Sequence, residues 1–202
     1  MNSMNKLVIY MIGSLKNPKI PEIAKEIRGL GKELSIEIEA FDDWFSPGPE
    51  ADDFWRNFEK VRGSTYKQAL RNYAGKHIFE FDKFHIDRAD IGILIMPAGK
   101  SGHMELGYLM GRCKTCFVFF EEEPERWDVM YQFAMENDGD VCFTKEELFD
   151  GLRKLFAKLA IRTIDKYEQI ASTMNWHNRC ARATLGDLPE VTAEDIRRMY
   201  EG

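Results

Sequence analysis

The sequence predicts an α/β fold in which helices cover the faces of a mostly parallel, five-stranded sheet. Strand and helix signals alternate through the first three-quarters of the chain, which is the pattern of parallel strands joined by crossover helices. The run IGILIM, residues 91–96, is apolar throughout, as expected for a strand that is buried on both faces. With 202 residues, 44% of them hydrophobic, the chain can bury a sizeable core.

Five segments have the composition of strands. The first, residues 7–13, and the third, 91–96, are apolar. The second, 34–41, alternates apolar and acidic residues, so we expect it to be half exposed and near an edge of the sheet. The fourth and fifth strands are expected at 116–120 and 141–143, each after a turn.

Helices are expected between these strands. Pro18 and Pro21 open the first helix, and Gly29 and Gly31 are expected to end it. Further helices are predicted at 54–61, 64–84 and 102–112, and from residue 144 to about residue 174.

The end of the chain breaks the alternation of strands and helices. A second capping signal, Thr192 to Asp195, predicts a short helical tail there. We therefore expect one domain over residues 1–155, with 156–202 as its C-terminal helical extension.

Charge and composition exclude several classes of function. The formal net charge of −6 argues against a generic nucleic-acid or acidic-membrane binder, because either partner favours a basic face. No apolar run is long enough to span a bilayer, and the first residues show no cleavage pattern, so a cytoplasmic protein is expected. Cys113 and Cys116 read as small residues that enter a buried strand, since no second pair stands at zinc spacing. We expect neither a metal nor another cofactor.

Two carboxylates flank the strand at 91–96, and each has a chemical and a purely structural interpretation. Glu105 follows Ser101, a plausible N-cap, so the start of the helix favours an ionised carboxylate that can attack an acetal-like carbon. Asp82 lies towards the end of a helix, where the macrodipole favours a protonated carboxyl that can act as an acid. The structural interpretation of Glu105 is that acidic residues are common in first helical turns because they stabilise the helix. Asp87 and Asp90 are rival candidates for the acid, although solvation at the start of the strand explains both.

Three turns at the carboxyl ends of strands are candidate binding segments, because ligands of open α/β sheets gather there. The turn GSLKNP offers Gly13, Ser14 and Lys16 to an anion or a hydroxyl. Asp43 and Trp44 follow the second strand, where the indole either stacks on a planar base or serves as a hydrophobic anchor. The third turn, PAGKSG, adds Gly99 and Ser101.

Three stretches, YMIGSLKN, DKFHIDRAD and PAGKSGHMELGYLMGR, together resemble the nucleoside 2-deoxyribosyltransferase superfamily, which includes the deoxynucleoside 5'-monophosphate N-glycosidases. The resemblance covers about residues 6–155 and implies a flavodoxin-like three-layer fold. It implies that Glu105 is the nucleophile, which forms a deoxyribosyl ester at C1', that Asp82 protonates the departing base, and that Tyr10 orients the nucleophile. It further implies a homo-oligomer, a dimer or larger, in which a neighbouring subunit completes the pocket with Asp128 and Met130.

The resemblance leaves the group at the 5' position of the sugar open. Monophosphate-cleaving members tend to have a serine where this chain has Asp128, and transferases that act on free nucleosides have an asparagine. An aspartate repels a phosphate, which favours a free 5'-hydroxyl, whereas Lys16 favours a phosphate. The leading hypothesis is an enzyme that cleaves the N-glycosidic bond of a 2'-deoxynucleoside and transfers the sugar to another nucleobase or to water. A 2'-deoxynucleoside 5'-monophosphate N-glycosidase and a non-catalytic nucleotide-binding module are the alternatives.

Overall fold

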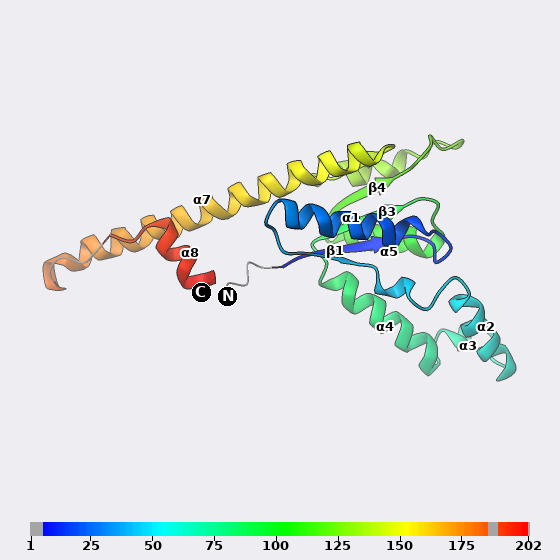
Figure 1. Ribbon diagram of the computed structural model, residues 1–202. Helices are drawn as coiled ribbons and strands as arrows, with labels where there is room; N and C mark the ends of the chain where they lie inside the picture. Colours follow the sequence, from blue (N-terminus) through cyan, green and yellow to red (C-terminus); the bar gives the residue numbers. More distant parts are fainter. Residues whose placement is uncertain (1–5, 186–189, 202) are drawn as a thin grey trace. The chain divides into compact units, whose positions relative to one another are not determined.

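The computed structural model describes residues 6–185 and 190–201, and within them a parallel five-stranded sheet forms the centre of the fold (Figure 1). The strand order is β2-β1-β3-β4-β5, which is the flavodoxin-like order. The strands are β1 Leu7–Ile12, β2 Ile38–Phe41, β3 Ile91–Ile95, β4 Thr115–Phe119 and β5 Asp140–Cys142. The predicted α/β class is confirmed, and all neighbouring strands pair in parallel.

Helices precede and follow these strands in the alternation that the sequence predicts. They are α1 Lys19–Glu33, α2 Ala51–Val61, α3 Tyr66–Ala69, α4 Tyr73–Asp87, α5 Lys100–Gly111, α6 Gln132–Met135, α7 Lys145–Leu185 and α8 Ala193–Glu201. Two 3-10 turns, η1 Asp43–Phe45 and η2 Val129–Tyr131, lie in the loops after β2 and β4.

The two faces of β1 meet different helices. A Cβ placed on Gly13, just after β1, would lie 2.5 Å from Ile20 Cδ1, so the odd-numbered residues of this strand face α1. Ile12 lies on the other face, where it approaches Gly102 of α5. Tyr10 shares that face with Ile12, because side chains alternate along a strand, and it belongs to the core cluster that includes Leu106 of α5.

The edge position of β2 is confirmed, but the strand begins four residues later than expected. The reason is that the preceding backbone caps α1: the amide of Ile36 donates to the carbonyl of Gly31 at 2.8 Å. The prediction that glycines end α1 is wrong, since the helix continues through both to Glu33. A single Gly in a helix costs only about 1 kcal/mol, which the buried apolar face of α1 offsets.

The single helix predicted over residues 64–84 is two helices. The break falls at Asn72, which is extended (φ −74°, ψ 162°) and is the N-cap residue of α4. Its side-chain amide donates to the carboxylate of Glu59 at 2.7 Å and to Ser64 Oγ at 3.1 Å. These bonds hold the turn between α3 and α4, and α4 then continues to Asp87, one turn beyond the predicted end.

The helix expected to end near residue 174 continues to Leu185. The predicted capping signal in the tail is confirmed, because the amide of Asp195 donates to Thr192 Oγ1 at 3.1 Å before α8. By compactness the chain divides into a unit Lys6–Phe149 and a second unit that includes the chain from Asp150 onwards. The expected boundary after residue 155 stays a prediction. No helix in the described ranges is both long and apolar enough to cross a membrane.

Candidate active site

Three titratable side chains meet on the face of the sheet that α4 and α5 cover. Tyr10 lies in the middle of β1, Asp82 in α4 and Glu105 in α5. Tyr10 is 1% exposed, and the two carboxyl side chains are partly buried. The charges of Asp82 and Glu105 both act on Tyr10, and the charge of Asp82 acts on Glu105, so the three form one electrostatically coupled group.

Glu105 departs from the ionisation state that the sequence predicts. The N-cap of α5 is Gly99, not Ser101, so Glu105 stands more than one turn into the helix, where the effect of the macrodipole has largely faded. Burial, and then the neighbouring charge of Asp82, raises the pKa of Glu105 to about 7. In the empty site this carboxyl therefore holds its proton up to neutral pH.

Asp82 has the raised pKa that the sequence predicts, but for a different reason. It lies five residues before the end of α4, outside the last turn. Burial raises its pKa to about 6, and the negative charge of Asp52 in the first turn of α2 adds to the effect. The surroundings of the side chain, rather than the helix end, make it a weak acid.

Tyr10 remains a phenol at physiological pH. Burial, and then the charges of Glu105 and Asp82, hold its pKa well above the ordinary value. Its ring stacks on Phe41 at 5.6 Å between centroids, and Phe41 in turn stacks on His85 of α4 at 3.7 Å. This column of rings fixes the phenol beside the two carboxyls.

A second set of contacts joins the start of β2 to the end of α4. Arg88 forms a two-pronged ion pair with Glu39, and its Nε donates to His85 Nδ1 at 3.0 Å. Because of this pair, the pKa of Glu39 falls to about 2. The guanidinium also lies 5.5 Å from the ring centre of Phe41, so the column of rings is anchored at its outer end.

The predicted anion-binding turn after β1 is tied to the end of β3. Asn17 is buried, and its side-chain amide donates to the carbonyl of Met96 at 3.2 Å. Ser14 Oγ accepts the amide of Lys16 at 3.2 Å, which shapes the turn, and Lys16 itself is exposed. The close approach of Gly13 brings the two strand ends together, since a Cβ there would lie 3.1 Å from the carbonyl of Ile95.

Trp44 serves as an anchor for the loop after β2. Its Nε1 donates to the carbonyl of Met11 at 2.7 Å, at a point where β1 extends past the end of β2. The ring packs against the core cluster, whereas Asp43 beside it is exposed. Of the two interpretations of Trp44, the contacts favour the anchor.

Asp128 and Met130 lie in the loop after β4, and both are exposed. Asp128 caps η2 by accepting the amide of Met130 at 3.0 Å. Tyr131 then contacts α5 of the same chain, with its hydroxyl 2.9 Å from Nε2 of His103. The segment therefore lies beside the first turns of α5, where Gly99 and Ser101 are exposed.

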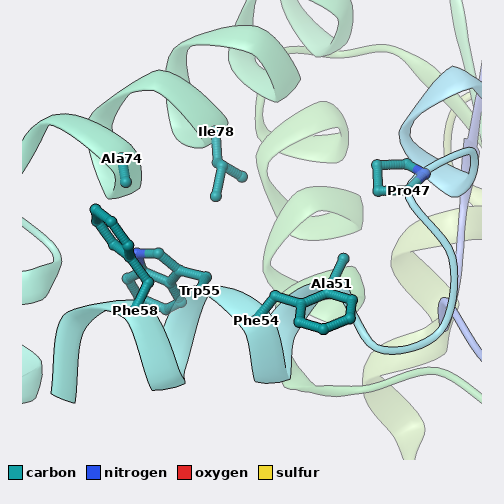
Figure 2. Close-up of a pocket in the computed structure, with 7 residues that line it drawn as sticks. All are labelled: Pro47, Ala51, Phe54, Trp55, Phe58, Ala74 and Ile78. Atoms are coloured by element: carbon teal, nitrogen blue, oxygen red, sulfur yellow. The ribbon is translucent and has the colours of Figure 1, made fainter. Parts of the chain in front are cut away.

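An apolar cavity of about 440 Å³ lies between α2 and α4 (Figure 2). It is lined by Pro47, Ala51, Phe54, Trp55, Phe58, Ala74 and Ile78. None of the three coupled groups lines it, but Ile78 lies one turn before Asp82 on the same helix. Trp55 Nε1 is buried there and has no hydrogen-bond partner among the described residues.

Several of these residues carry no signal in the sequence. Asp52 is an ordinary acidic residue in the first turn of α2, and it raises the pKa of Asp82 only because α2 packs near α4. Asn17 forms a hydrogen bond to a residue 79 positions away, and His103 to one 28 positions away, so neither contact can be recognised in the sequence. The roles predicted for the site residues stay predictions. Among the residues with described positions, no group of three His, Cys, Asp or Glu side chains is placed to hold a metal.

No family model and no curated protein matches the chain. Several solved structures are similar to part of it, among them the following two. A conserved protein from Enterococcus faecalis V583 is 12% identical over 74% of this chain and 98% of its own, with a TM-score of 0.48. A 2-deoxyribosyltransferase from Bacillus psychrosaccharolyticus is 16% identical over 63% of this chain and 81% of its own, with a TM-score of 0.39. Likenesses of this extent carry no conclusion about family or activity, so the function has to follow from the residues of the site.

Proposed function

We propose that the protein cleaves the N-glycosidic bond of a 2'-deoxynucleoside through a covalent ester on Glu105. The observation that carries the proposal is the coupled group of Tyr10, Asp82 and Glu105, in which two partly buried carboxyls have pKa values of about 6 and about 7. A pair of carboxyls is what glycoside cleavage with a covalent intermediate requires. The sequence resemblance to the deoxyribosyltransferases supports the choice of sugar.

The reaction has two steps. In the first, a carboxylate oxygen of Glu105 attacks C1', the bond from C1' to the base nitrogen breaks, and Asp82 gives its proton to that nitrogen. In the second, an incoming base or water attacks C1', its proton passes to Asp82, and the ester bond breaks to release Glu105. Tyr10 stays protonated, so its hydroxyl is a donor that orients the attacking carboxylate.

The raised pKa values leave one proton on the carboxyl pair near neutral pH, and in the empty site that proton lies mainly on Glu105, because Asp82 has the lower pKa. The productive form carries the same single negative charge but has Glu105 ionised and Asp82 protonated, so the reaction requires the proton to pass from Glu105 to Asp82 once substrate is bound. Because burial raises both pKa values and the charge of Asp82 further opposes the ionisation of Glu105, the pair loses its two protons in separate steps near pH 6 and pH 7. The singly charged form is therefore most abundant between these values.

A free 5'-hydroxyl is the group that we propose at the far end of the sugar. Asp128 places a negative charge on the loop after β4, which disfavours a phosphate. Lys16 is the feature that favours the 5'-monophosphate alternative, because it is exposed beside Ser14 in the turn after β1.

We further propose that the protein acts as a homo-oligomer in which Asp128 and Met130 reach a neighbouring subunit's site. The exposure of large apolar side chains on α2 and α4 supports this, since such surfaces are typical of protein interfaces. These side chains are Phe54, Phe58, Val61, Ile78, Phe79 and Phe84, and their exposed fractions run from 48% to 90%.

The test is the release of free base from deoxynucleosides, followed by chromatography and mass spectrometry. We expect wild-type protein to release base and Glu105→Ala to release none. Glu122→Gln is the matched control, because Glu122 is an exposed glutamate in the loop after β4. Undiminished release by Glu105→Ala would refute the proposal. Adding a second free base and looking for a new nucleoside separates transfer from hydrolysis.

A second comparison decides the 5' group and the non-catalytic alternative. Each deoxynucleoside is assayed beside its 5'-monophosphate, and we expect faster cleavage of the free nucleoside. Faster cleavage of the monophosphate, lost in Lys16→Met, would favour the N-glycosidase. Tight calorimetric binding with no base release over hours would favour a binding module.

A further inference from the structure

Helix α4 carries the proposed acid, yet it is weakly held by apolar packing. Ile86 is its only fully buried side chain, although every residue of the helix is described. By contrast, α5 buries both Leu106 and Leu109. The ring stack of His85 on Phe41 holds α4 to β2, so the position of Asp82 relative to Glu105 of α5 depends in addition on polar contacts between the two helices.

A polar cluster on the surface joins α4 to α5 next to the two carboxyls. The hydroxyl of Tyr108 donates to Asp87 Oδ1 at 2.6 Å and accepts from Lys83 Nζ at 3.2 Å and from Arg112 Nη1 at 3.2 Å. A phenol has one hydrogen to donate and two lone pairs to accept with, so these three bonds use its whole capacity. Lys83 and Asp87 also form an ion pair with each other.

The ring of Tyr108 takes part as well. Lys83 Nζ lies 5.3 Å and Arg112 Cζ 5.5 Å from its centre, both within the range of cation–π contacts. An isolated surface ion pair contributes at most about 1 kcal/mol. Here one side chain of α5 connects two residues of α4 and one at the end of α5, so the contacts act together on the relation of the two helices.

The residues of the cluster are near neighbours of the two carboxyls along the same two helices. Tyr108 lies one turn after Glu105 on α5, and Lys83 directly follows Asp82 on α4. The pair between Arg88 and Glu39 holds the end of α4 to β2 and not to α5. Arg112 Nη1 also lies 3.7 Å from Asp87 Oδ1, at the end of both helices. Tyr108 makes the shorter contacts, with both Lys83 and Asp87, and it lies nearer to the site along α5.

We propose that Tyr108 is a positioning residue, which holds α4 against α5 and so fixes the separation of Asp82 and Glu105. The effect of Tyr108 on catalysis rests on the proposed function. Its effect on the separation of the two carboxyls does not, because the coupling between their titrations can be measured in the protein without substrate.

The test is Tyr108→Phe, which removes three hydrogen bonds and keeps the ring beneath both cations. Tyr73→Phe is the matched control, because Tyr73 is an α4 tyrosine that is 84% exposed and its hydroxyl makes none of these bonds. Carboxyl titrations by NMR, in empty wild type and variants, report the coupling between Asp82 and Glu105. The other titratable groups that are coupled to this pair, Asp52 and Tyr10, are the same in wild type, Tyr108→Phe and Tyr73→Phe.

In Tyr108→Phe we expect the Glu105 titration to shift to lower pH, because a more distant Asp82 opposes its ionisation less. If the proposed function holds, kcat falls about tenfold to a hundredfold while KM changes little, since misplacement by about 1 Å costs on that order. Titrations that match wild type in Tyr108→Phe would overturn the inference, whatever the activity. Absence of base release by wild type would instead refute the proposed function. Should Tyr108→Phe fail to fold, Asp87→Ala decides by the same titration, because it removes the oxygen that accepts the Tyr108 hydroxyl.

Discussion

Glu105→Gln should make the protein more stable at high pH, and by an amount that can be worked out. The pKa of Glu105 rises from an ordinary value of 4.5 to about 7 on folding, chiefly through burial. At about 1.4 kcal/mol for each pH unit, the ionised side chain costs the folded state on the order of 3 kcal/mol. Gln has nearly the same shape and never carries this charge.

The sign of the pH dependence follows from the direction of the shift. Between about pH 4.5 and pH 7 the folded protein binds this proton more tightly than the unfolded chain. The contribution of Glu105 to stability is therefore complete below pH 4.5 and is lost as the pH rises through about 7. The variant lacks this loss, so its advantage over wild type grows across the same range and then levels off.

Urea unfolding of both proteins, followed by circular dichroism from about pH 4.5 to about pH 8.5, measures the difference in the free energy of unfolding. Any change in packing or hydrogen bonding adds an offset that does not vary with pH. Glu122→Gln removes one negative charge at an exposed position, so it measures how much the loss of a charge alone changes the free energy of unfolding of this acidic protein. A difference between Glu105→Gln and wild type that stays constant over the whole range refutes the reasoning.

Three further predictions concern activity and stability. The kcat/KM for base release should follow a bell-shaped profile with limbs near pH 6 and pH 7, because both carboxyls are protonated below this range and both ionised above it; a rate that stays flat into alkaline pH would contradict this. Trp44→Phe should lower the free energy of unfolding by about 1 kcal/mol or more in urea titrations, since it leaves the carbonyl of Met11 without its indole donor. Gly139→Ala should cost at least about 2 kcal/mol in the same assay, because its Cβ would lie 1.8 Å from the carbonyl oxygen of Cys116; wild-type stability would show that β4 and β5 separate without strain.

The order of the elements was predictable because it depends on local patterns. Continuous apolar runs marked the buried strands, and alternation marked β2 as an edge strand. The boundaries that were wrong are those set by distant partners. The break before α4 depends on Asn72 reaching Glu59, and the late start of β2 depends on Ile36 capping α1.

The candidate site was predictable to a similar degree. The sequence places Asp82 and Glu105 on either side of β3, and the packing of α4 and α5 brings them into electrostatic contact. Their pKa values were not predictable from helix positions, because burial outweighs the macrodipole in both cases. The influence of Asp52 arises only once α2 is packed, so no spacing in the sequence indicates it.

Asn17 has a consequence for any attempt to redesign specificity. Its buried amide bonds to the carbonyl of Met96, so the turn after β1 and the turn after β3 share one hydrogen-bonded joint. A graft that replaces residues 13–18 alone would leave that carbonyl without its donor, and a graft of the other turn alone would present the amide with a misplaced acceptor. The two turns therefore form a single transplantable module, and exchange between proteins of this fold should carry both turns together.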